Sequence, residues 1–256
     1  FKPKKFSLLT GEAITMIPSK TNFNKYHAFL SKVSLFKDIL EKDLTDFFHS
    51  MQIKQYHKGE MLTFNAPDHD KCYIVYEGLF KLTKFDENGD EIVIKILDKS
   101  DAISPMHFSP HYEVCAEFVK KTTLIYFTKK DIDIFIAKNH QFSTNIIDFL
   151  AKGVQDLLLS AEVLQLKSAK EKVGWYLVHA KINNTFELPY SKALIASYLG
   201  LKPESFSRAL AKLKEEGIVL DNKTIKLLNG DELCKYCDKV IGSDCPSFLT
   251  ENCAHN

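Results

Sequence analysis

Residues 188–217 read LPYSKALIASYLGLKPESFSRALAKLKEEG and predict two short helices joined by a tight turn. Ser191 can cap the first helix, because its side-chain oxygen can accept a hydrogen bond from a backbone N–H group of the first turn. Gly200 can adopt the left-handed backbone that a tight turn needs. Pro203 suits the first position of the second helix, where its missing N–H group costs nothing. The stretch therefore predicts a helix-turn-helix.

The second helix is expected to extend to about Glu216 and to bury Phe206, Leu210 and Leu213, which are spaced by four and three residues. Its small and polar side chains are then left toward solvent or a ligand: Glu204, Ser205, Ser207, Arg208 and Lys212. Two apolar runs follow, around a polar tip at 221–223, and predict a β-hairpin wing.

Arg208 is the single arginine among 34 basic residues. A guanidinium is a planar fork that can grip a guanine edge with two hydrogen bonds, whereas a lysine is a flexible point charge. The position of Arg208 in the second helix favours a role in reading DNA bases. The alternative is that the one arginine of a lysine-rich chain falls there by chance.

The cap, the turn and the Glu-x-x-Ser-Arg core together resemble the winged helix-turn-helix of the cyclic-AMP receptor and fumarate-nitrate reductase regulator (CRP/FNR) superfamily of bacterial transcription factors. The resemblance implies that Glu204, Ser207 and Arg208 touch base edges of double-stranded DNA. We add four lysines and a serine as candidate DNA contacts: Lys192, Lys202, Lys212, Lys223 and Ser205. The hypothesis is a near-palindromic site with TTGA-like half-sites, and RNA polymerase as a partner if the protein is an activator.

Charge is distributed unevenly along the chain. Residues 166–230 hold eleven Lys or Arg and six Asp or Glu, a net of +5, while the remainder holds 23 and 27, a net of −4. A basic segment on a mildly acidic protein is typical of a DNA-binding domain, although lysine-rich solvated faces are also common.

The first half of the chain contains many short strand-like runs, which predict a β-roll (jelly roll) in an α+β fold. The runs are 51–56, 72–76, 79–85, 92–97, 112–119 and 124–127. Gly59, the pair Glu77-Gly78 and the pair Asn88-Gly89 resemble the turns of the cyclic-nucleotide-binding-type sensory domain of the same superfamily. The alternative function is a β-roll ligand-binding module that regulates a partner enzyme.

The segment Ser100-Asp-Ala-Ile-Ser-Pro105 departs from the superfamily's cyclic-nucleotide site, which uses a Gly-x-x-Phe-Gly-Glu loop and a nearby arginine. Both glycines and the glutamate are missing, and no arginine precedes Arg208. A buried phosphate would be poorly paired here, so cyclic AMP is not expected as the effector.

Apolar residues between the two domains recur with helical spacing and predict a dimerisation helix that forms a homodimer. The predicted interface residues are Ile146, Leu150, Gly153, Leu157, Ala161 and Leu164. The expected organisation is an N-terminal extension (1–25), a β-roll (26–137), the dimerisation helix (138–166), the DNA-binding domain (167–230) and a cysteine-rich tail (231–256).

Six cysteines divide into two groups. Cys72 and Cys115 lie in strand-like runs and are expected to be small buried hydrophobic residues. The other four could gather around zinc or an iron-sulfur cluster, act as a thiol redox switch, or bind nothing: Cys234, Cys237, Cys245 and Cys253. A haem held by histidines in or beside the β-roll is the rival sensor, with candidates His57, His69, His107 and His111.

The sequence has no apolar run near the roughly 18 residues of a membrane span and no secretory signal, so a cytoplasmic protein without a membrane partner is expected. It also has no phosphate-binding Gly-Lys-Ser/Thr loop, nucleophile elbow or His-Glu-x-x-His motif, and an enzyme is therefore not expected. The favoured interpretation is a regulator that responds to a redox or gas signal such as oxygen or nitric oxide.

Overall fold

The computed structural model describes residues 15–16, 20–64, 70–104, 114–182, 190–216, 219–220, 225–226 and 231–237. It divides into two compact units, 1–154 and 155–256. No helix within the described ranges is long and apolar enough to cross a membrane.

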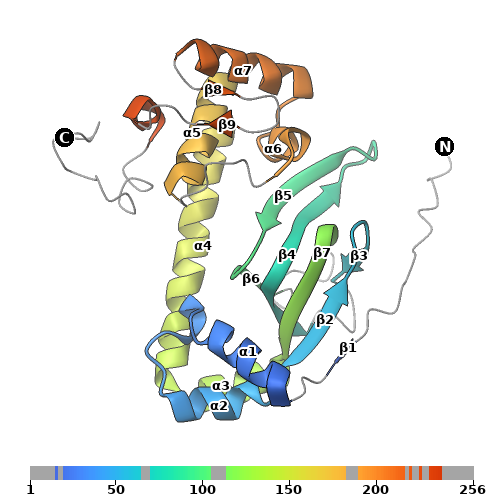
Figure 1. Ribbon diagram of the computed structural model, residues 1–256, viewed down its shortest axis with the longest axis vertical. Helices are drawn as coiled ribbons and strands as arrows, with labels where there is room; N and C mark the ends of the chain where they lie inside the picture. The colour runs from blue at the N-terminus through green and yellow to red at the C-terminus, as the bar shows by residue number, and fades with distance from the viewer. Residues whose placement is uncertain are drawn as a thin grey trace. The chain divides into compact units, whose positions relative to one another are not determined.

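The first unit is built on an antiparallel sheet in the order β1-β2-β7-β4-β5, with β3 paired to β7 and β6 paired to β4 (Figure 1). Its strands are β1 (Thr15–Met16), β2 (Gln52–Tyr56), β3 (Met61–Thr63), β4 (Lys71–Phe85), β5 (Glu91–Leu97), β6 (Ala102–Ile103) and β7 (Cys115–Thr128). This mixed helix and β-roll architecture confirms the predicted α+β fold class.

Two pairs of predicted strands are in fact single long strands. The runs 72–76 and 79–85 both belong to β4. Residues 115–119 of the run 112–119 and the run 124–127 both belong to β7, and residues 112–113 lie outside the described residues. Gly78 is a bulge inside β4 rather than a turn between strands, with φ +118° and with register shifts on both sides. A Cβ atom there would lie 2.4 Å from the Cα atom of Thr122, so only glycine fits this close approach between strands.

Short helices cover one face of the sheet and form a core rich in phenylalanine. They are α1 (Lys20–Leu30), η1 (Ser34–Phe36), α2 (Glu41–Phe48) and α3 (Lys129–Lys138). Phe47 stacks on Phe127 of β7 and on Phe135 of α3, with ring centroids 4.4 and 4.2 Å apart. The predicted extension 1–25 is thus partly structural, because α1 starts at Lys20 and Phe23 packs on this core.

Neighbouring residues of β4 point to opposite faces of the sheet. Ile74 belongs to the phenylalanine-rich core under the helices, whereas Tyr73 and Val75 belong to a second core with Phe80 and Phe118. We call these the helix-side core and the roll core.

The long helix α4 (His140–Leu166) begins in the first unit. Its start is anchored by Phe142, which is buried in the helix-side core, and by Asn145. The Asn145 side-chain amide donates to the backbone carbonyls of Leu35 and Lys37 at 3.0 and 2.8 Å.

The second unit contains α5 (Ala169–Ile182), α6 (Lys192–Tyr198), α7 (Pro203–Glu215), the hairpin of β8 (Val219–Leu220) and β9 (Ile225–Lys226), and η3 (Asp231–Tyr236). Its core joins α5, α6 and α7, with Trp175 and Leu213 buried. Leu233 and Tyr236 of η3 are buried in the same core. The predicted end of the DNA-binding domain at 230 therefore falls too early, and the cysteine-rich segment starts inside this unit.

Candidate nucleic-acid interface

The helix-turn-helix forms for the local reasons that the sequence indicates. The Ser191 hydroxyl accepts a hydrogen bond from the Leu194 N–H group at 3.2 Å and caps α6. Gly200 has φ +62° in the turn, and Pro203 opens α7. The predicted cap, turn and helix start are all confirmed.

One side of α7 is buried and the other is polar. Phe206, Leu210 and Leu213 are buried as predicted, together with Ala209. Glu204, Ser207 and Arg208 are exposed, and their spacing of three and four residues places them on one face of the helix. Ser205 is half-buried, and its hydroxyl accepts a hydrogen bond from the Arg208 guanidinium at 3.4 Å.

The structure describes three of the four lysines that are predicted to contact DNA. Lys192, Lys202 and Lys212 are exposed. Lys223 lies outside the described residues, as does the tip of the wing. The base of the wing is present as predicted, because β8 pairs with β9 through Val219 opposite Lys226 and Leu220 opposite Ile225.

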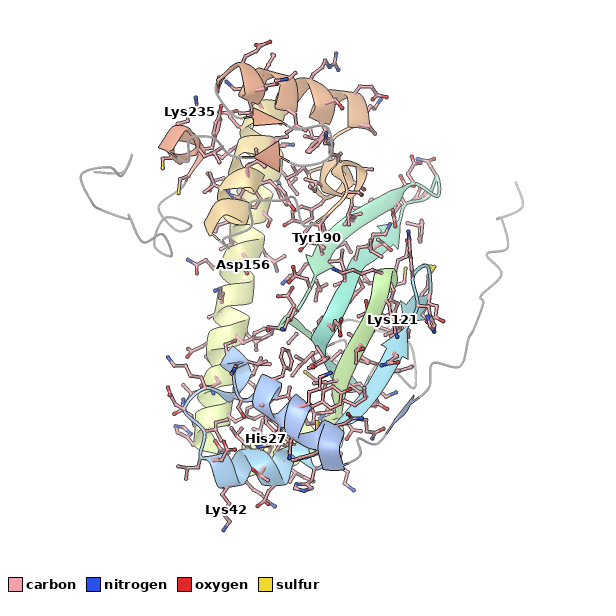
Figure 2. The ribbon with its side chains drawn as sticks, in the orientation of Figure 1. His27, Lys42, Lys121, Asp156, Tyr190 and Lys235 are labelled. Carbon is pink, nitrogen blue, oxygen red and sulfur yellow. The ribbon has the colours of Figure 1, made fainter. Side chains whose placement is uncertain are left out.

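A charged cluster at the end of α7 was not foreseen from the sequence. The Glu216 carboxylate accepts hydrogen bonds from Lys170 of α5 at 2.7 Å, from Lys235 of η3 at 2.8 Å and from the Tyr236 hydroxyl at 2.8 Å. Lys235 extends from η3 in Figure 2. These partners are far apart along the chain, and no motif marks them. We call this group the Glu216 cluster.

The cluster changes the acidity of its members. The hydrogen bonds from Lys170, Lys235 and Tyr236 lower the pKa of Glu216 to about 2. Burial, followed by the hydrogen bond to Glu216, raises the pKa of Tyr236. The cluster therefore ties the end of α7 to α5 and to the segment that carries Cys234 and Cys237.

The candidate cofactor ligands are only partly described. Cys234 and Cys237 are half-buried at η3, and Cys237 packs against the core of the second unit. Cys245 and Cys253 lie outside the described residues. In the part of the chain that the structure describes, no three His, Cys, Asp or Glu side chains are close enough together to hold a metal ion.

The haem candidates gain no support from the described residues. His57 is exposed, and His69, His107 and His111 lie outside the described ranges. Cys115 is buried as expected, with its sulfur 3.3 Å from the Thr83 hydroxyl oxygen. Cys72 is half-buried, and burial of its sulfur raises the pKa of the thiol to about 12.

Residues 100–104 are the described part of the segment that departs from the cyclic-nucleotide loop. Ser100 has φ +77°, and the Asp101 carboxylate accepts a hydrogen bond from the backbone N–H group of Asp98. The described part of this segment thus carries a carboxylate and no positively charged side chain.

Most of the predicted dimer residues are exposed. Leu150, Leu157 and Leu164 expose 48%, 66% and 43% of their surface, and Ala161 is also exposed. Ile146 instead packs partly on the helix-side core, and Gly153 is half-buried. Ile147 and Val154 are the more exposed neighbours of these two positions.

Comparison with known proteins agrees with this geometry. The family model for the Crp-like helix-turn-helix domain matches residues 163–236. The nitrogen fixation regulation protein FixK of Bradyrhizobium diazoefficiens is 26% identical over 185 residues, which cover 69% of this chain and 78% of that protein. The transcriptional activator protein Anr of Pseudomonas protegens is 24% identical over 69% of this chain and 77% of that protein.

Solved structures with the same fold include FixK2 from Bradyrhizobium japonicum, with a TM-score of 0.64 and 21% identity over 73% of this chain and 98% of that one. A mutant of CooA from Carboxydothermus hydrogenoformans has a TM-score of 0.61 and 20% identity over 73% of this chain and 88% of that one. A β-roll followed by a winged helix-turn-helix defines a class of transcription regulators that bind DNA. The helix-turn-helix match and the curated relatives together support the CRP/FNR superfamily of that class.

Proposed function

We propose that the protein is a dimeric one-component transcription regulator that reads a near-palindromic, TTGA-like DNA site with α7. The observation that carries the proposal is the polar face of α7, on which Glu204, Ser207 and Arg208 are exposed while the opposite face is buried. Such a helix can enter the major groove without exposing its apolar side chains.

Each exposed side chain has a chemical role in this proposal. Arg208 can donate two hydrogen bonds to the O6 and N7 atoms of guanine, and Glu204 can accept one from a cytosine amino group. Lys192, Lys202 and Lys212 supply phosphate attraction, which positions the protein but carries no sequence information. RNA polymerase is a further partner if the protein activates transcription.

The dimer is proposed from an exposed apolar stripe on α4. Ile147, Leu150, Val154, Leu157, Ala161 and Leu164 follow one another with spacings of 3, 4, 3, 4 and 3 residues. This alternation matches the spacing of the seam in a two-helix coiled coil, which supports the proposed dimer. It uses Ile147 and Val154 in place of Ile146 and Gly153. Two copies of α7 can then reach half-sites one DNA turn apart, about 34 Å.

Arg208→Lys tests the base-reading role. The variant should lose about 1 to 3 kcal/mol of discrimination at the guanine of the half-site and keep its salt-dependent affinity for random DNA. Fluorescence anisotropy with TTGA-containing and scrambled duplexes measures both affinities. Lys214→Arg is the matched control, since Lys214 is exposed on α7 outside the proposed contacts. Equal losses on the two duplexes would refute the assignment.

We further propose that the signal is a redox or gas signal received at the C-terminal cysteines rather than a cyclic nucleotide. The support is that Cys234 and Cys237 flank Lys235 and Tyr236, which bind the Glu216 carboxylate at the end of α7. Zinc, an iron-sulfur cluster or a reversible disulfide would each constrain this segment and so change how α7 is held.

The cysteine proposal is tested with protein purified without oxygen. Iron and zinc analysis, the absorption spectrum and DNA affinity are compared before and after exposure to air or nitric oxide. Replacing Cys234 and Cys237 together by serine should remove the metal or the disulfide and the response. Cys115→Ser, at a buried cysteine of the first unit, is the control. An unchanged response in the double variant would place the sensor elsewhere.

A further inference from the structure

An apolar cavity lies between the sheet and the helices of the first unit. Its volume is about 240 Å³, and the described residues that line it lie between 35 and 150. Its walls include Phe36, Ile74, Phe127, Ile132, Phe142 and Phe149. The site is thus concave and largely hydrophobic, as small-molecule sites usually are.

The cavity lies mainly on the helix side of the sheet, and one residue of the roll core, Ile103, also lines it. Cys72 and Ile74 line it, whereas the alternate residues Tyr73 and Val75 belong to the roll core. Ala102 of β6 pairs with Ile74 across the sheet and lines the cavity beside it. A ligand here would contact residues of η1, β4, β6, β7, α3 and α4.

The described lining contains few polar groups, and its two charged residues pair with each other. The Ser104 hydroxyl oxygen is buried, and none of the described residues offers it a hydrogen-bond partner. The Cys72 thiol stays neutral because burial raises its pKa to about 12. The charged residues of the lining, Lys129 and Asp133, form an ion pair with each other one turn apart on α3.

We propose that this cavity binds an uncharged, mainly apolar molecule of about ten non-hydrogen atoms that carries one hydroxyl or carbonyl group. The size follows from comparison with an apolar cavity of about 150 Å³ that holds benzene. The polar group is expected because the Ser104 hydroxyl can donate or accept one hydrogen bond. An ionised ligand is disfavoured because no unpaired charge of opposite sign lines the cavity among the described residues.

The cavity also contacts the helix proposed to form the dimer. Ile146, Phe149 and Leu150 of α4 line it, and Leu150 belongs to the exposed stripe as well. A bound molecule would therefore act on the position of α4 and on DNA affinity. This regulatory consequence rests on the proposed function, whereas binding to the cavity does not.

Octanol and octanoate are the probes, because they share a chain of suitable size and differ in charge. Binding is measured by titration calorimetry and by thermal stabilisation of the full chain without DNA. Octanol should bind saturably and stabilise the protein, and octanoate should bind at least tenfold more weakly. Absence of saturable octanol binding, or tighter binding of octanoate, overturns the proposal.

Matched variants locate the bound probe. Ile136→Trp places a large ring at the cavity, whereas Ile134→Trp places the same ring on α3 outside it, and both positions are exposed in the native chain. Ile136→Trp should abolish octanol binding, and Ile134→Trp should leave it unchanged. Ser104→Ala should weaken binding about five- to tenfold through loss of one hydrogen bond.

The outcomes separate binding from regulation. Octanol binding that Ile136→Trp leaves intact would show a different site and refute the assignment. Octanol binding at the cavity without DNA binding by the protein would preserve the site and refute the proposed function instead.

Discussion

Gly174→Ala tests whether η3 is part of the DNA-binding unit. A Cβ atom at residue 174 would lie 2.5 Å from the Cγ atom of Tyr236, closer than real Cβ contacts come. The contact is with the base of an aromatic ring that is only 9% exposed, so the ring cannot simply swing into free space within the core. Tyr236 would have to leave its place on α5.

The expected magnitude combines two opposing effects. Overpacking at a buried contact costs about 1 to 3 kcal/mol. Alanine in place of glycine inside a helix returns about 1 kcal/mol through its higher helix propensity. Displacement of Tyr236 also breaks its hydrogen bond to Glu216, which adds about 1 kcal/mol. The net loss of unfolding free energy should be about 1 to 3 kcal/mol.

Urea unfolding, followed by tryptophan fluorescence, measures this loss of unfolding free energy in the second unit, residues 155–256. Trp175 is the single tryptophan of the chain, neighbours Gly174 on α5 and is buried. Tyr236→Ala serves as the paired variant, because the alanine at 174 should cost nothing further once the ring is removed. The packing of Tyr236 on α5 would be refuted if the double variant were less stable than Tyr236→Ala alone. It would also be refuted if the Gly174→Ala single variant were more stable than the native chain.

The remaining predictions concern the charged cluster, the effector and the dimer. Glu216→Gln should cost about 1 kcal/mol at neutral pH, a modest value because these ion pairs are partly exposed. The pKa of Glu216 is about 2 in the folded protein against an ordinary 4.5. The stabilisation by its ion pairs is therefore complete above about pH 4.5 and is lost as the pH falls toward 2. The unfolding free energies of the variant and the native chain should converge at that low pH. Cyclic AMP should change neither melting temperature nor DNA affinity, whereas a ligand at a hundred times its dissociation constant would add about 2.7 kcal/mol of stability. Leu157→Glu should yield folded monomers in analytical ultracentrifugation because the side chain is 66% exposed in the single chain, and Gln155→Glu, an exposed position off the stripe, should stay dimeric.

The features that the sequence predicts well are those set by nearby residues. Ser191, Gly200 and Pro203 each act on a backbone within a few residues of themselves, so the helix-turn-helix follows from local chemistry. The helical face of α7 follows from periodicity for the same reason. The polar face of the candidate interface was therefore accessible from the sequence alone.

The features that the sequence does not predict depend on distant partners. Gly78 is a bulge and not a turn because Thr122, 44 residues away, lies against it. Glu216 contacts residues 46 positions before it and 20 positions after it. Neither contact leaves a spacing that a single sequence could reveal, because tertiary packing decides both.

Among the described cysteines, the redox hypothesis favours Cys234 and Cys237 over Cys72 and Cys115. Thiolate, not thiol, is the form that reacts with oxidants and binds metals. Burial raises the pKa of Cys72 to about 12 and also raises that of Cys115, so both thiols stay protonated and unreactive near neutral pH. Cys234 and Cys237 are half-buried, and they flank Lys235 and Tyr236, which bind the Glu216 carboxylate. A signal received there has a short structural route to α7 through Lys235, Tyr236 and Glu216. Glu216→Gln should therefore weaken the response of DNA binding to oxidant while leaving metal content unchanged, and an unaltered response would show that the signal does not pass through the Glu216 cluster.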